Sequence, residues 1–425
     1  MASPAHESRL RRLLARLDRA LDPAAAGRER LTALIKEVRD NGRRDAARIG
    51  KRMDALESAM TGVAATLSAG QQQLADVRAI TRRHRDLLAR HLEHSGLETM
   101  GARSEQRVEQ RLRRIAQSRQ PIIVGPWTGE IGFELLYWIP FLRWACRTFA
   151  LDPERLIVVS RGGVAAWYGH LTPHYEEVFR HATTDEFRAA TIGRKKQRRL
   201  RRFDRSLIRC VMRARKLTRA HLLHPQMMYA LFATFWSDTS TTRQLEAHSK
   251  VRMLSAVDPP DNGSPALPKS FVAVKFYFSD CFPDTEANRA FAARVVDGLA
   301  AQGDVVLLSN DFRVDDHHDF APQQAARIHR VHCDRAETNL AVQTAAIRRA
   351  SAFVGTYGGF SYLAPFYGVP SFAFYSEATF ERHHLEYAHR VFERLGSARL
   401  TAIAVSDTSH LAGAFAGLLA SPSGS

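Results

Sequence analysis

The chain has 425 residues and a formal net charge of +17, from 61 Lys and Arg residues against 44 Asp and Glu residues. This length allows more than one hydrophobic core, and the excess positive charge favours anionic partners such as phosphorylated substrates, anionic lipid or nucleic acid. We expect no transmembrane helix, because no run of about 18 apolar residues occurs, and the N-terminus lacks the apolar core of a secretory signal. The four cysteines are widely spaced, which predicts reduced thiols in a cytoplasmic protein.

Residues 1–118 are predicted to form a helical arm. Apolar residues between Ile49 and Val77 alternate at spacings of four and three, which is the a/d seam of a coiled coil over about four heptads. Gly70 interrupts this seam. We expect the arm to form a homo-oligomer through the coiled coil, with a helical hairpin packed on the same chain as the alternative.

Residues 119–257 begin with the pattern of a parallel α/β domain. A short apolar strand at 122–124 is followed by a Gly-rich loop, an apolar helix and a second strand at 156–160. In such folds the active edge lies at the carboxyl ends of the strands, where Glu130 and Glu134 are placed. Either Glu can also be a plain carboxylate that is stabilised at a helix N-terminus.

A basic segment, Arg194 to Arg219, interrupts this domain. Its apolar residues recur at near-helical spacing, which predicts an amphipathic basic helix. The helix can present a solvated face, contact an anionic membrane surface or acceptor, or bind nucleic acid. We expect no nucleic-acid partner.

A Pro- and Gly-rich linker at 258–269 precedes the third predicted domain, residues 270–425. Strands and helices alternate in this domain, as in a doubly wound fold of Rossmann type. The predicted strands are 271–277, 305–309, 328–332, 353–354, 371–375 and 401–405, and the predicted helices are 286–301, 338–350, 377–395 and 408–420. Neither a GxGxxG nor a GxxxxGK[ST] motif is present, so nicotinamide, flavin and P-loop nucleotide chemistry are not expected.

The stretch Phe353 to Ser376 combines a strand, a Gly-rich turn, a short helix and a second strand. Gly355, Gly358 and Gly359 allow a tight turn, and Ser361 is placed to cap the short helix. Such a turn collects backbone N–H groups at the positive end of a helix, where a phosphate can bind. The alternative is that the glycines serve packing alone.

Over residues 119–425 the chain resembles GT-B glycosyltransferases, in particular heptosyltransferases. One matching segment is ASAFVGTYGGFSYLAPFYGVPSFAFY, residues 350–375, where that family binds the diphosphate of a nucleotide sugar. The aromatic Tyr-Gly-Gly-Phe departs from the family's Asp-Thr/Ser-Gly pattern. The resemblance implies that the donor diphosphate contacts Gly355, Thr356, Tyr357, Gly358, Gly359, Phe360 and Ser361, with Lys275 on the first strand of the domain as a further contact.

The second matching segment is FELLYWIPFL in the N-terminal loop and helix. Heptosyltransferases place an Asp six positions before a Pro on this helix, and here Glu134 precedes Pro140 by that interval. The resemblance therefore implies that Glu134 is the general base that takes the acceptor hydroxyl's proton, with Glu130 as the nearby rival.

Three further residues are candidates for contact with the nucleotide or its ribose. Asn310 follows a predicted strand at its carboxyl end, Glu337 precedes a predicted helix, and Glu377 begins the helix after the Gly-rich turn. The run Asp315 to Asp319 is rich in metal-ligating residue types, but consecutive residues in an extended loop bring few ligands to one ion. We predict no metal and no cofactor other than the nucleotide-sugar substrate.

The resemblance implies transfer of a sugar from a nucleotide-activated donor to a hydroxyl of a glycan or lipid-linked acceptor in surface polysaccharide assembly. The basic segment 194–219 would then bring the enzyme to the inner face of the cytoplasmic membrane as a peripheral protein. Two alternatives stay open. One is a nucleotide-sugar epimerase of the same shape, and the other is a coiled-coil scaffold with a degenerate sugar-nucleotide-binding domain.

Overall fold

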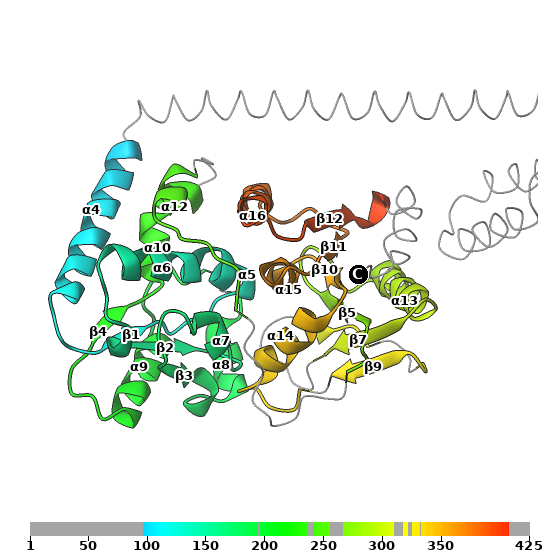
Figure 1. Ribbon diagram of the computed structural model, residues 1–425, viewed down its shortest axis with the longest axis horizontal. Helices are drawn as coiled ribbons and strands as arrows, with labels where there is room; N and C mark the ends of the chain where they lie inside the picture. Colours follow the sequence, from blue (N-terminus) through cyan, green and yellow to red (C-terminus); the bar gives the residue numbers. More distant parts are fainter. Residues whose placement is uncertain are drawn as a thin grey trace, which may run out of the picture. The chain divides into compact units, whose positions relative to one another are not determined.

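The computed structural model describes residues 97–193, 196–236, 242–255, 267–309, 318–321, 325–331 and 333–407. The predicted coiled-coil seam, most of the linker, Asn310 and the predicted C-terminal helix lie outside these residues. Leu92–Thr408 form one compact unit, which is drawn in colour in Figure 1 where it is described. Among the described residues, no helix is both long enough and apolar enough to cross a membrane.

The first half of the unit is built on a four-stranded parallel sheet. Its strands are β1 (Ile122–Val124), β2 (Leu156–Ser160), β3 (Tyr175–Glu177) and β4 (His221–Leu223), in the order β3-β2-β1-β4. Ile122 is in register with Leu156 on one side and with His221 on the other. The chain therefore crosses from one side of β1 to the other between β3 and β4.

Helices cover both faces of this sheet (Figure 1). The helices are α5 (Ile131–Phe133), α6 (Ile139–Thr148), α7 (Ala165–Tyr168), α8 (Thr184–Thr191), α9 (Arg202–Ala214), α10 (Gln226–Leu231), α11 (Ala233–Trp236) and α12 (Arg243–Ala247). Successive residues of β1 point to opposite faces: Ile123 packs with α8 and α9, whereas Ile122 and Val124 join the large core that contains α6 and α10. A π-helical turn, Glu134–Trp138, joins α5 to α6.

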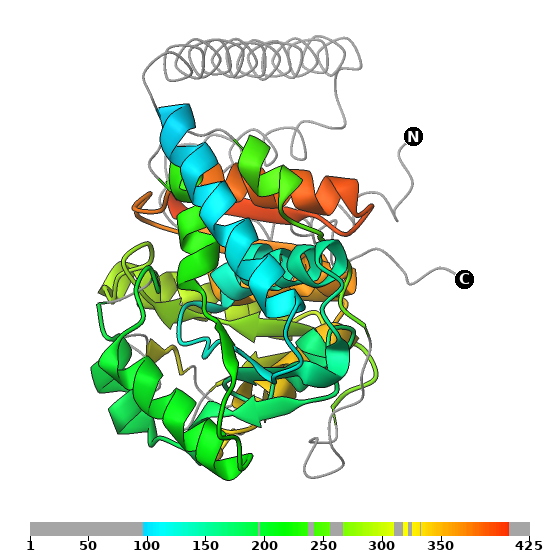
Figure 2. The same cartoon turned by 90° about the vertical axis from the view of Figure 1, so that its left-hand side faces the viewer.

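The last helix of the predicted arm, α4 (Leu97–Ala116), packs against this half and is not separate from it. Val108, Leu112 and Ile115 are buried in the large core, and His248 near α12 contacts Glu105 at 3.0 Å. Figure 2 shows α4 lying across this side of the unit. The predicted arm, residues 1–118, therefore overlaps the compact unit in this helix.

The second half contains a six-stranded parallel sheet. Its strands are β5 (Phe271–Lys275), β7 (Asp304–Leu308), β9 (Ile328–Val331), β10 (Ala352–Thr356), β11 (Ser371–Tyr375) and β12 (Leu400–Ala404), in the order β12-β11-β10-β5-β7-β9. Counted from β5, this is the 3-2-1-4-5-6 order of the Rossmann fold, with its switch point between β5 and β10. The prediction of an α/β fold with parallel sheets is confirmed.

Among the described residues, four α-helices accompany this sheet: α13 (Glu286–Ala300), α14 (Asn339–Arg349), α15 (Gly359–Leu363) and α16 (Arg382–Arg394). Figure 1 places α13 on the opposite side of the strands from α14 and α15. The expected strand 271–277 is divided, because the Thr356 hydroxyl bonds both the N–H and the carbonyl of Tyr277. Tyr277 instead begins β6 (Tyr277–Phe278), which pairs antiparallel with β8 (His318–Asp319).

Two local expectations in this half were wrong. The helix expected from Glu377 begins at Arg382, with Glu381 as its N-cap, so Glu377 lies in the preceding loop. Ser361 was expected to occupy the N-cap position of the short helix, but Gly358 does so, and the Ser361 hydroxyl accepts the Gly358 N–H from the third position of α15.

The basic segment forms a loop and the helix α9. Leu207 and Val211 on its apolar side are buried against the first sheet, with Ile123 and Val159. Arg205, Arg209 and Arg213 are exposed on the other side. The apolar face of this helix is therefore used within the fold, and its charged face is left for solvent or a partner.

Candidate functional site

The two Gly-rich segments lie at equivalent places in the two sheets. The first follows β1 at the point where the strand order reverses between β1 and β4, and the second follows β10 at the reversal between β5 and β10. In open parallel sheets, ligands bind outside the carboxyl ends of the strands at such switch points. Both segments are therefore candidate ligand sites on topology alone.

These two segments contact each other directly. A Cβ added to Gly359 at the start of α15 would lie 2.8 Å from Cβ of Ile131, and one added to Gly132 would lie 3.0 Å from the Tyr362 ring. Both glycines are thus required by the close approach of α5 to α15. The structure brings the loop carrying Glu130 and the Gly355–Ser361 turn to one place.

Glu134 lies in the interior, with 0% of its surface exposed. Its Oε1 accepts hydrogen bonds from the hydroxyls of Ser160 (2.6 Å) and Tyr168 (2.5 Å). Its Oε2 lies 3.4 Å from the Arg161 guanidinium. Burial raises the pKa of the Glu134 carboxyl, while the Arg161 charge and the hydroxyl donors oppose that rise.

Arg161 connects this buried carboxylate to the Gly-rich loop. Its second guanidinium nitrogen donates to the carbonyl of Gly129 at 2.6 Å, one residue before Glu130. Gln197 holds the same loop from the other side, because its amide donates to the Pro126 carbonyl and accepts from the N–H of Thr128. Sequence reasoning missed Arg161, although a polar residue directly after a buried strand was a usable signal.

Glu130 lies at the surface of this contact. It is partly buried and is the N-cap residue of α5, without a side-chain capping bond to that helix. Its charge raises the pKa values of Tyr229, Tyr357 and Tyr362, each of which is raised first by burial. Of the two carboxylates, Glu130 is the one whose charge acts on tyrosines of the Gly-rich turn of the other half.

The predicted diphosphate turn is closed by its own hydroxyls. The Ser361 hydroxyl donates to the Gly358 carbonyl at 2.7 Å and accepts from the Gly358 N–H at 3.2 Å. Thr356 is fully buried, and its hydroxyl holds the backbone of Tyr277. Tyr357 and Tyr362 share a short hydrogen bond between their hydroxyls.

Gly358 is required by a second close approach. A Cβ at this position would lie 1.8 Å from the hydroxyl oxygen of Tyr277. Gly355 is equally constrained, because its added Cβ would lie 2.0 Å from the carbonyl oxygen of Lys275 on the adjacent strand. Gly355 thus lets the backbone of Lys275 approach the turn, and Gly358 lets the side chain of Tyr277 approach it.

Lys275 stands at the carboxyl end of β5 and is 3% exposed. Its ammonium group donates to the Leu308 carbonyl and to Asp319, each at 3.0 Å. It also lies 5.0 Å from the centre of the Phe360 ring, next to the Gly-rich turn. The structure thus places a buried positive charge beside the predicted phosphate site.

The other predicted nucleotide contacts are not brought together here. Glu337 is partly exposed near Arg335, and its carbonyl lies against Gly163 in the loop after β2. Glu377 is exposed, and its N–H donates to the Cys281 carbonyl. Asn310 lies outside the described residues. In the run Asp315 to Asp319, where no metal site was predicted, His318 pairs with Asp284, and Asp319 pairs with Lys275.

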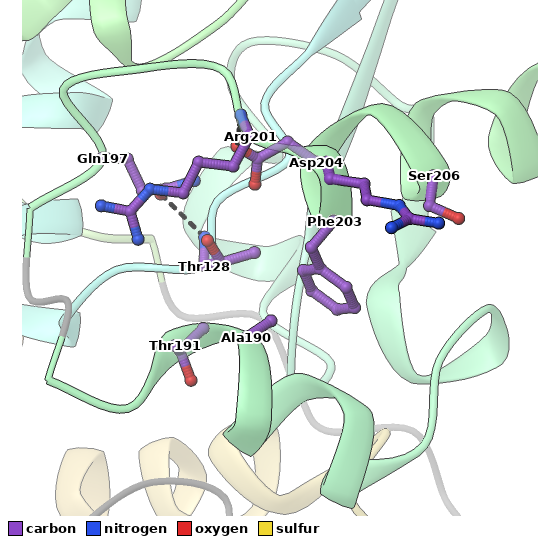
Figure 3. A pocket seen from close by; sticks show the side chains of 9 residues that line it. Thr128, Ala190, Thr191, Gln197, Arg201, Phe203, Asp204 and Ser206 are labelled. Carbon is purple, nitrogen blue, oxygen red and sulfur yellow. Dashed lines mark hydrogen bonds between the residues drawn. The ribbon is translucent and has the colours of Figure 1, made fainter.

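A separate pocket of about 370 Å³ opens beside the first Gly-rich loop. Figure 3 shows Arg201 extending past Gln197 and Thr128, with Phe203 below it and Thr191 opposite. The side chains lining the pocket are Thr128, Ala190, Thr191, Gln197, Arg201, Arg202, Phe203, Asp204 and Ser206. Within the described part of the chain, no ion pair involves the guanidinium of Arg201 or Arg202.

No protein-family model and no curated protein matches the chain. Matching solved structures include the Escherichia coli ADP-heptose lipopolysaccharide heptosyltransferase II, at 10% identity and a TM-score of 0.38, with 71% of this chain and 98% of that chain covered. The E. coli heptosyltransferase WaaC with ADP matches at 15% identity and a TM-score of 0.38, with 71% and 100% covered.

The glycosyltransferase TibC from enterotoxigenic E. coli H10407, described as iron-containing and dodecameric, matches at 16% identity and a TM-score of 0.29. The match covers 60% of this chain and 58% of TibC, so this chain spans less than two thirds of that protein. The matching structures are heptosyltransferases and other glycosyltransferases, as the sequence resemblance predicted.

Proposed function

We propose that this protein is a glycosyltransferase that moves a sugar from a nucleotide-activated donor to a hydroxyl of a glycan or lipid-linked acceptor. One observation carries the proposal: two Gly-rich segments, each at the switch point of its own parallel sheet, meet at Gly132 and Gly359. A two-substrate enzyme needs two binding edges that face each other, and this arrangement supplies them.

Glu130 is the general base in this proposal. The acceptor oxygen forms a bond to the anomeric carbon of the donor as the bond from that carbon to the diphosphate breaks. The hydroxyl proton passes to the Glu130 carboxylate, and the diphosphate leaves with the bonding electrons. Glu134 is a positioning residue, because its carboxylate holds Arg161, and Arg161 holds the Gly129 carbonyl beside Glu130.

The turn from Gly355 to Ser361 receives the donor diphosphate through its backbone N–H groups. Thr356 and Ser361 fix the shape of the turn, and Lys275 contributes positive charge when the diphosphate replaces part of its contact with Asp319. Because α5 packs on α15, the donor enters when these two elements separate. Glu337 and Glu377 remain candidates for the nucleotide, and no metal is assigned to the transfer step.

The pocket at Arg201 and Arg202 is the proposed acceptor entrance. It lies beside Thr128, two residues before Glu130, and combines two guanidinium groups with the ring of Phe203. These groups suit a sugar that carries a phosphate or carboxylate. The exposed arginines of α9 continue the positive surface and support peripheral contact with anionic lipid at the inner face of the cytoplasmic membrane, as in surface polysaccharide assembly.

The test begins with thermal shifts of the full chain in a panel of nucleotide sugars. A ligand that binds only the folded state raises the melting temperature by mass action, so we expect at least one nucleotide sugar to do so. The identified donor is then incubated with candidate acceptors, and loss of donor is measured with and without acceptor. Turnover that requires an acceptor supports a transferase, whereas isomerisation of the donor alone indicates an epimerase.

Arg201→Gln and Arg205→Gln provide a matched pair for the acceptor site. Each removes one positive charge from α9, Arg201 at its N-cap and Arg205 in its first turns. Of the two, only Arg201 lines the pocket. With a water-soluble acceptor, we expect Arg201→Gln to raise the acceptor KM and Arg205→Gln to leave it unchanged. A panel without any stabilising nucleotide sugar would contradict the donor assignment.

A further inference from the structure

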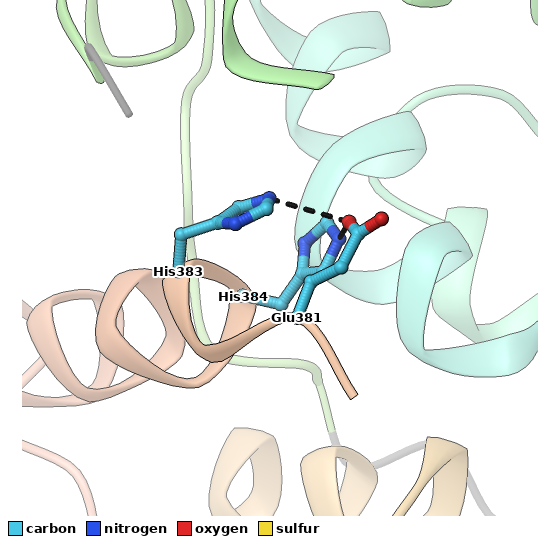
Figure 4. A group of neighbouring side chains, drawn as sticks. All are labelled: Glu381, His383 and His384. Carbon is cyan, nitrogen blue, oxygen red and sulfur yellow. Dashed lines mark hydrogen bonds and ion pairs between the residues drawn. The ribbon is translucent and has the colours of Figure 1, made fainter. Parts of the chain in front are cut away.

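A cluster of metal-ligating side chains lies at the start of α16, one residue after Phe380, whose ring is 4.2 Å from that of Tyr357 in the proposed donor turn. Glu381 is the N-cap residue of this helix, and His383 and His384 are in its first turn. Figure 4 shows both imidazole rings directed toward the carboxylate. Sequence reasoning missed this cluster. The helix was expected to begin at Glu377, so Glu381 was not placed at the N-cap position beside the two histidines.

The three ligand atoms already lie close to one another. Nε2 of His383 is 3.3 Å from Oε2 of Glu381, and Nε2 of His384 is 2.7 Å from the same oxygen. All the ligand atoms lie within 4.8 Å of one another. In a tetrahedral zinc site with bonds of about 2.0–2.2 Å, neighbouring ligand atoms are about 3.3–3.6 Å apart, so small side-chain movements suffice.

We propose that Glu381, His383 and His384 bind a divalent transition-metal ion of the Zn²⁺ class. Two imidazole nitrogens and one carboxylate oxygen are ligands that such ions prefer, and they leave a coordination position for water. The Glu381 side chain is 46% exposed, whereas both histidines are largely buried, which gives an ion a path from solvent into an ordered site.

The surroundings of His384 match those of a metal ligand. Its Nδ1 lies 2.6 Å from the hydroxyl of Tyr137, so the ring orientation is fixed while Nε2 points at Glu381. With a metal on Nε2, Nδ1 carries the proton and donates to the Tyr137 oxygen, which is the usual outer-shell arrangement. Phe133 and Phe235 pack edge-on against the two imidazoles and restrict their movement.

A protein cation occupies this place in the structure. The ammonium group of Lys196 lies 3.1 Å from each oxygen of Glu381 and stands over the rings of Phe133 and Trp236. A metal ion would take over the neutralisation of Glu381 and displace Lys196. A metal site here therefore predicts that Lys196 and the metal compete for Glu381. If the Lys196–Glu381 ion pair were only structural, no such competition would be expected.

A second group, Glu105, Glu109 and His248, offers a poorer site. It contains a single imidazole, and Glu109 is paired with Arg113 at 2.6 Å. This group serves as an internal comparison. The inference at α16 does not depend on the proposed transferase activity, and it leaves the expectation of a metal-independent transfer step unchanged.

The test is titration of the full chain with Co²⁺, followed by displacement with Zn²⁺. Four-coordinate Co²⁺ absorbs visible light much more strongly than the six-coordinate ion in water. We expect a saturable spectrum, and a melting temperature that rises with Zn²⁺. Tyr137→Phe should lower the Co²⁺ affinity about 10- to 100-fold. His383→Gln and His384→Gln should each lower it more. Lys196→Met should raise the affinity several-fold, because a competing cation is removed.

His389→Gln and His248→Gln are the controls. His389 is on the same helix but bonds the Leu400 carbonyl, and His248 belongs to the second group. Neither substitution should change the Co²⁺ spectrum or the affinity. The proposal is overturned if the unaltered protein shows no saturable spectrum, if His248→Gln abolishes it, or if His383→Gln and His384→Gln, folded by circular dichroism, bind as before. Weaker binding by Lys196→Met would also overturn the competition with this side chain.

Discussion

The loop after β1 and the turn after β10 occupy equivalent positions in their sheets, but their polar groups are satisfied in different ways. The loop after β1 is held from outside, by Arg161 at the Gly129 carbonyl and by Gln197 at Pro126 and Thr128. The turn after β10 is closed in part from within, by the bonds of the Ser361 hydroxyl to the Gly358 backbone, while Tyr277 and Cys281 donate to the Tyr357 carbonyl.

This difference separates two ways of building a site. The Ser361–Gly358 bonds of the turn join residues three positions apart, so they depend less on the placement of distant side chains. A loop held by distant side chains keeps its shape only when the rest of its half is folded. In the proposed reaction, the turn after β10 binds a diphosphate of constant shape. The loop after β1 positions the carboxylate of Glu130, which must be placed accurately.

The largest expected effect is that of Glu130→Gln on turnover. The amide keeps the size of the side chain but cannot take a proton, so transfer should fall by about 10²- to 10⁴-fold. Donor affinity, measured by calorimetry with the donor identified in the screen, should stay unchanged. Normal transfer by this variant would remove Glu130 from the role of base and leave the loop without a catalytic carboxylate.

Glu134→Gln tests the outside support of the same loop. The amide nitrogen cannot accept a hydrogen bond from Arg161, so we expect a loss of about 1–3 kcal/mol in the free energy of unfolding, measured with urea. Transfer should fall less than in Glu130→Gln, with the loss restored in part by Glu134→Asp.

The loss of stability in Glu134→Gln should also depend on pH. Burial raises the folded-state pKa of Glu134 above its unfolded value, so the folded protein holds this proton more tightly than the unfolded chain. The carboxyl's contribution is then full below the unfolded pKa and declines as pH rises through the folded pKa. The difference in unfolding free energy between Glu134→Gln and the unaltered protein should therefore become smaller as pH rises. A difference that grows with pH would contradict the raised pKa.

Gly358→Ala tests the closed turn at its tightest contact. The new methyl group would meet the Tyr277 hydroxyl at 1.8 Å, and overpacking of this kind costs about 1–3 kcal/mol. Thermal unfolding should show the loss, and Tyr277→Phe in the same chain should recover part of it, because the oxygen is gone. Additive losses in the double variant would show that this contact is not the cause.

The sequence predicted the turn after β10 better than the loop after β1, for a physical reason. Gly355, Gly358 and Gly359 are needed for contacts made close to the turn, and a local pattern of glycines between two apolar strands records that need. The parallel sheets were also predictable, because buried strands leave short apolar runs. At this turn only the position of Ser361 was misplaced, since it lies three positions after the N-cap residue Gly358.

The support of the loop after β1 could not be predicted in the same way. Arg161 and Gln197 are 32 and 69 residues from the backbone groups that they hold, and no local spacing connects them. Glu134 and Glu130 looked alike in sequence, and only packing separates a carboxylate buried among Ser160 and Tyr168 from one at the surface of the contact. Long-range burial decides such roles, and a linear pattern does not contain it.

Ser361→Ala should have the smallest effect, and it separates shape from binding at the turn. The hydroxyl makes two hydrogen bonds to Gly358, so its removal should cost about 1 kcal/mol in unfolding free energy. If backbone N–H groups hold the diphosphate, donor affinity should change less than about twofold in this variant. A tenfold weaker donor affinity with normal stability would instead show that the hydroxyl contacts the phosphate, and the turn after β10 would then depend on a side chain, as the loop after β1 does.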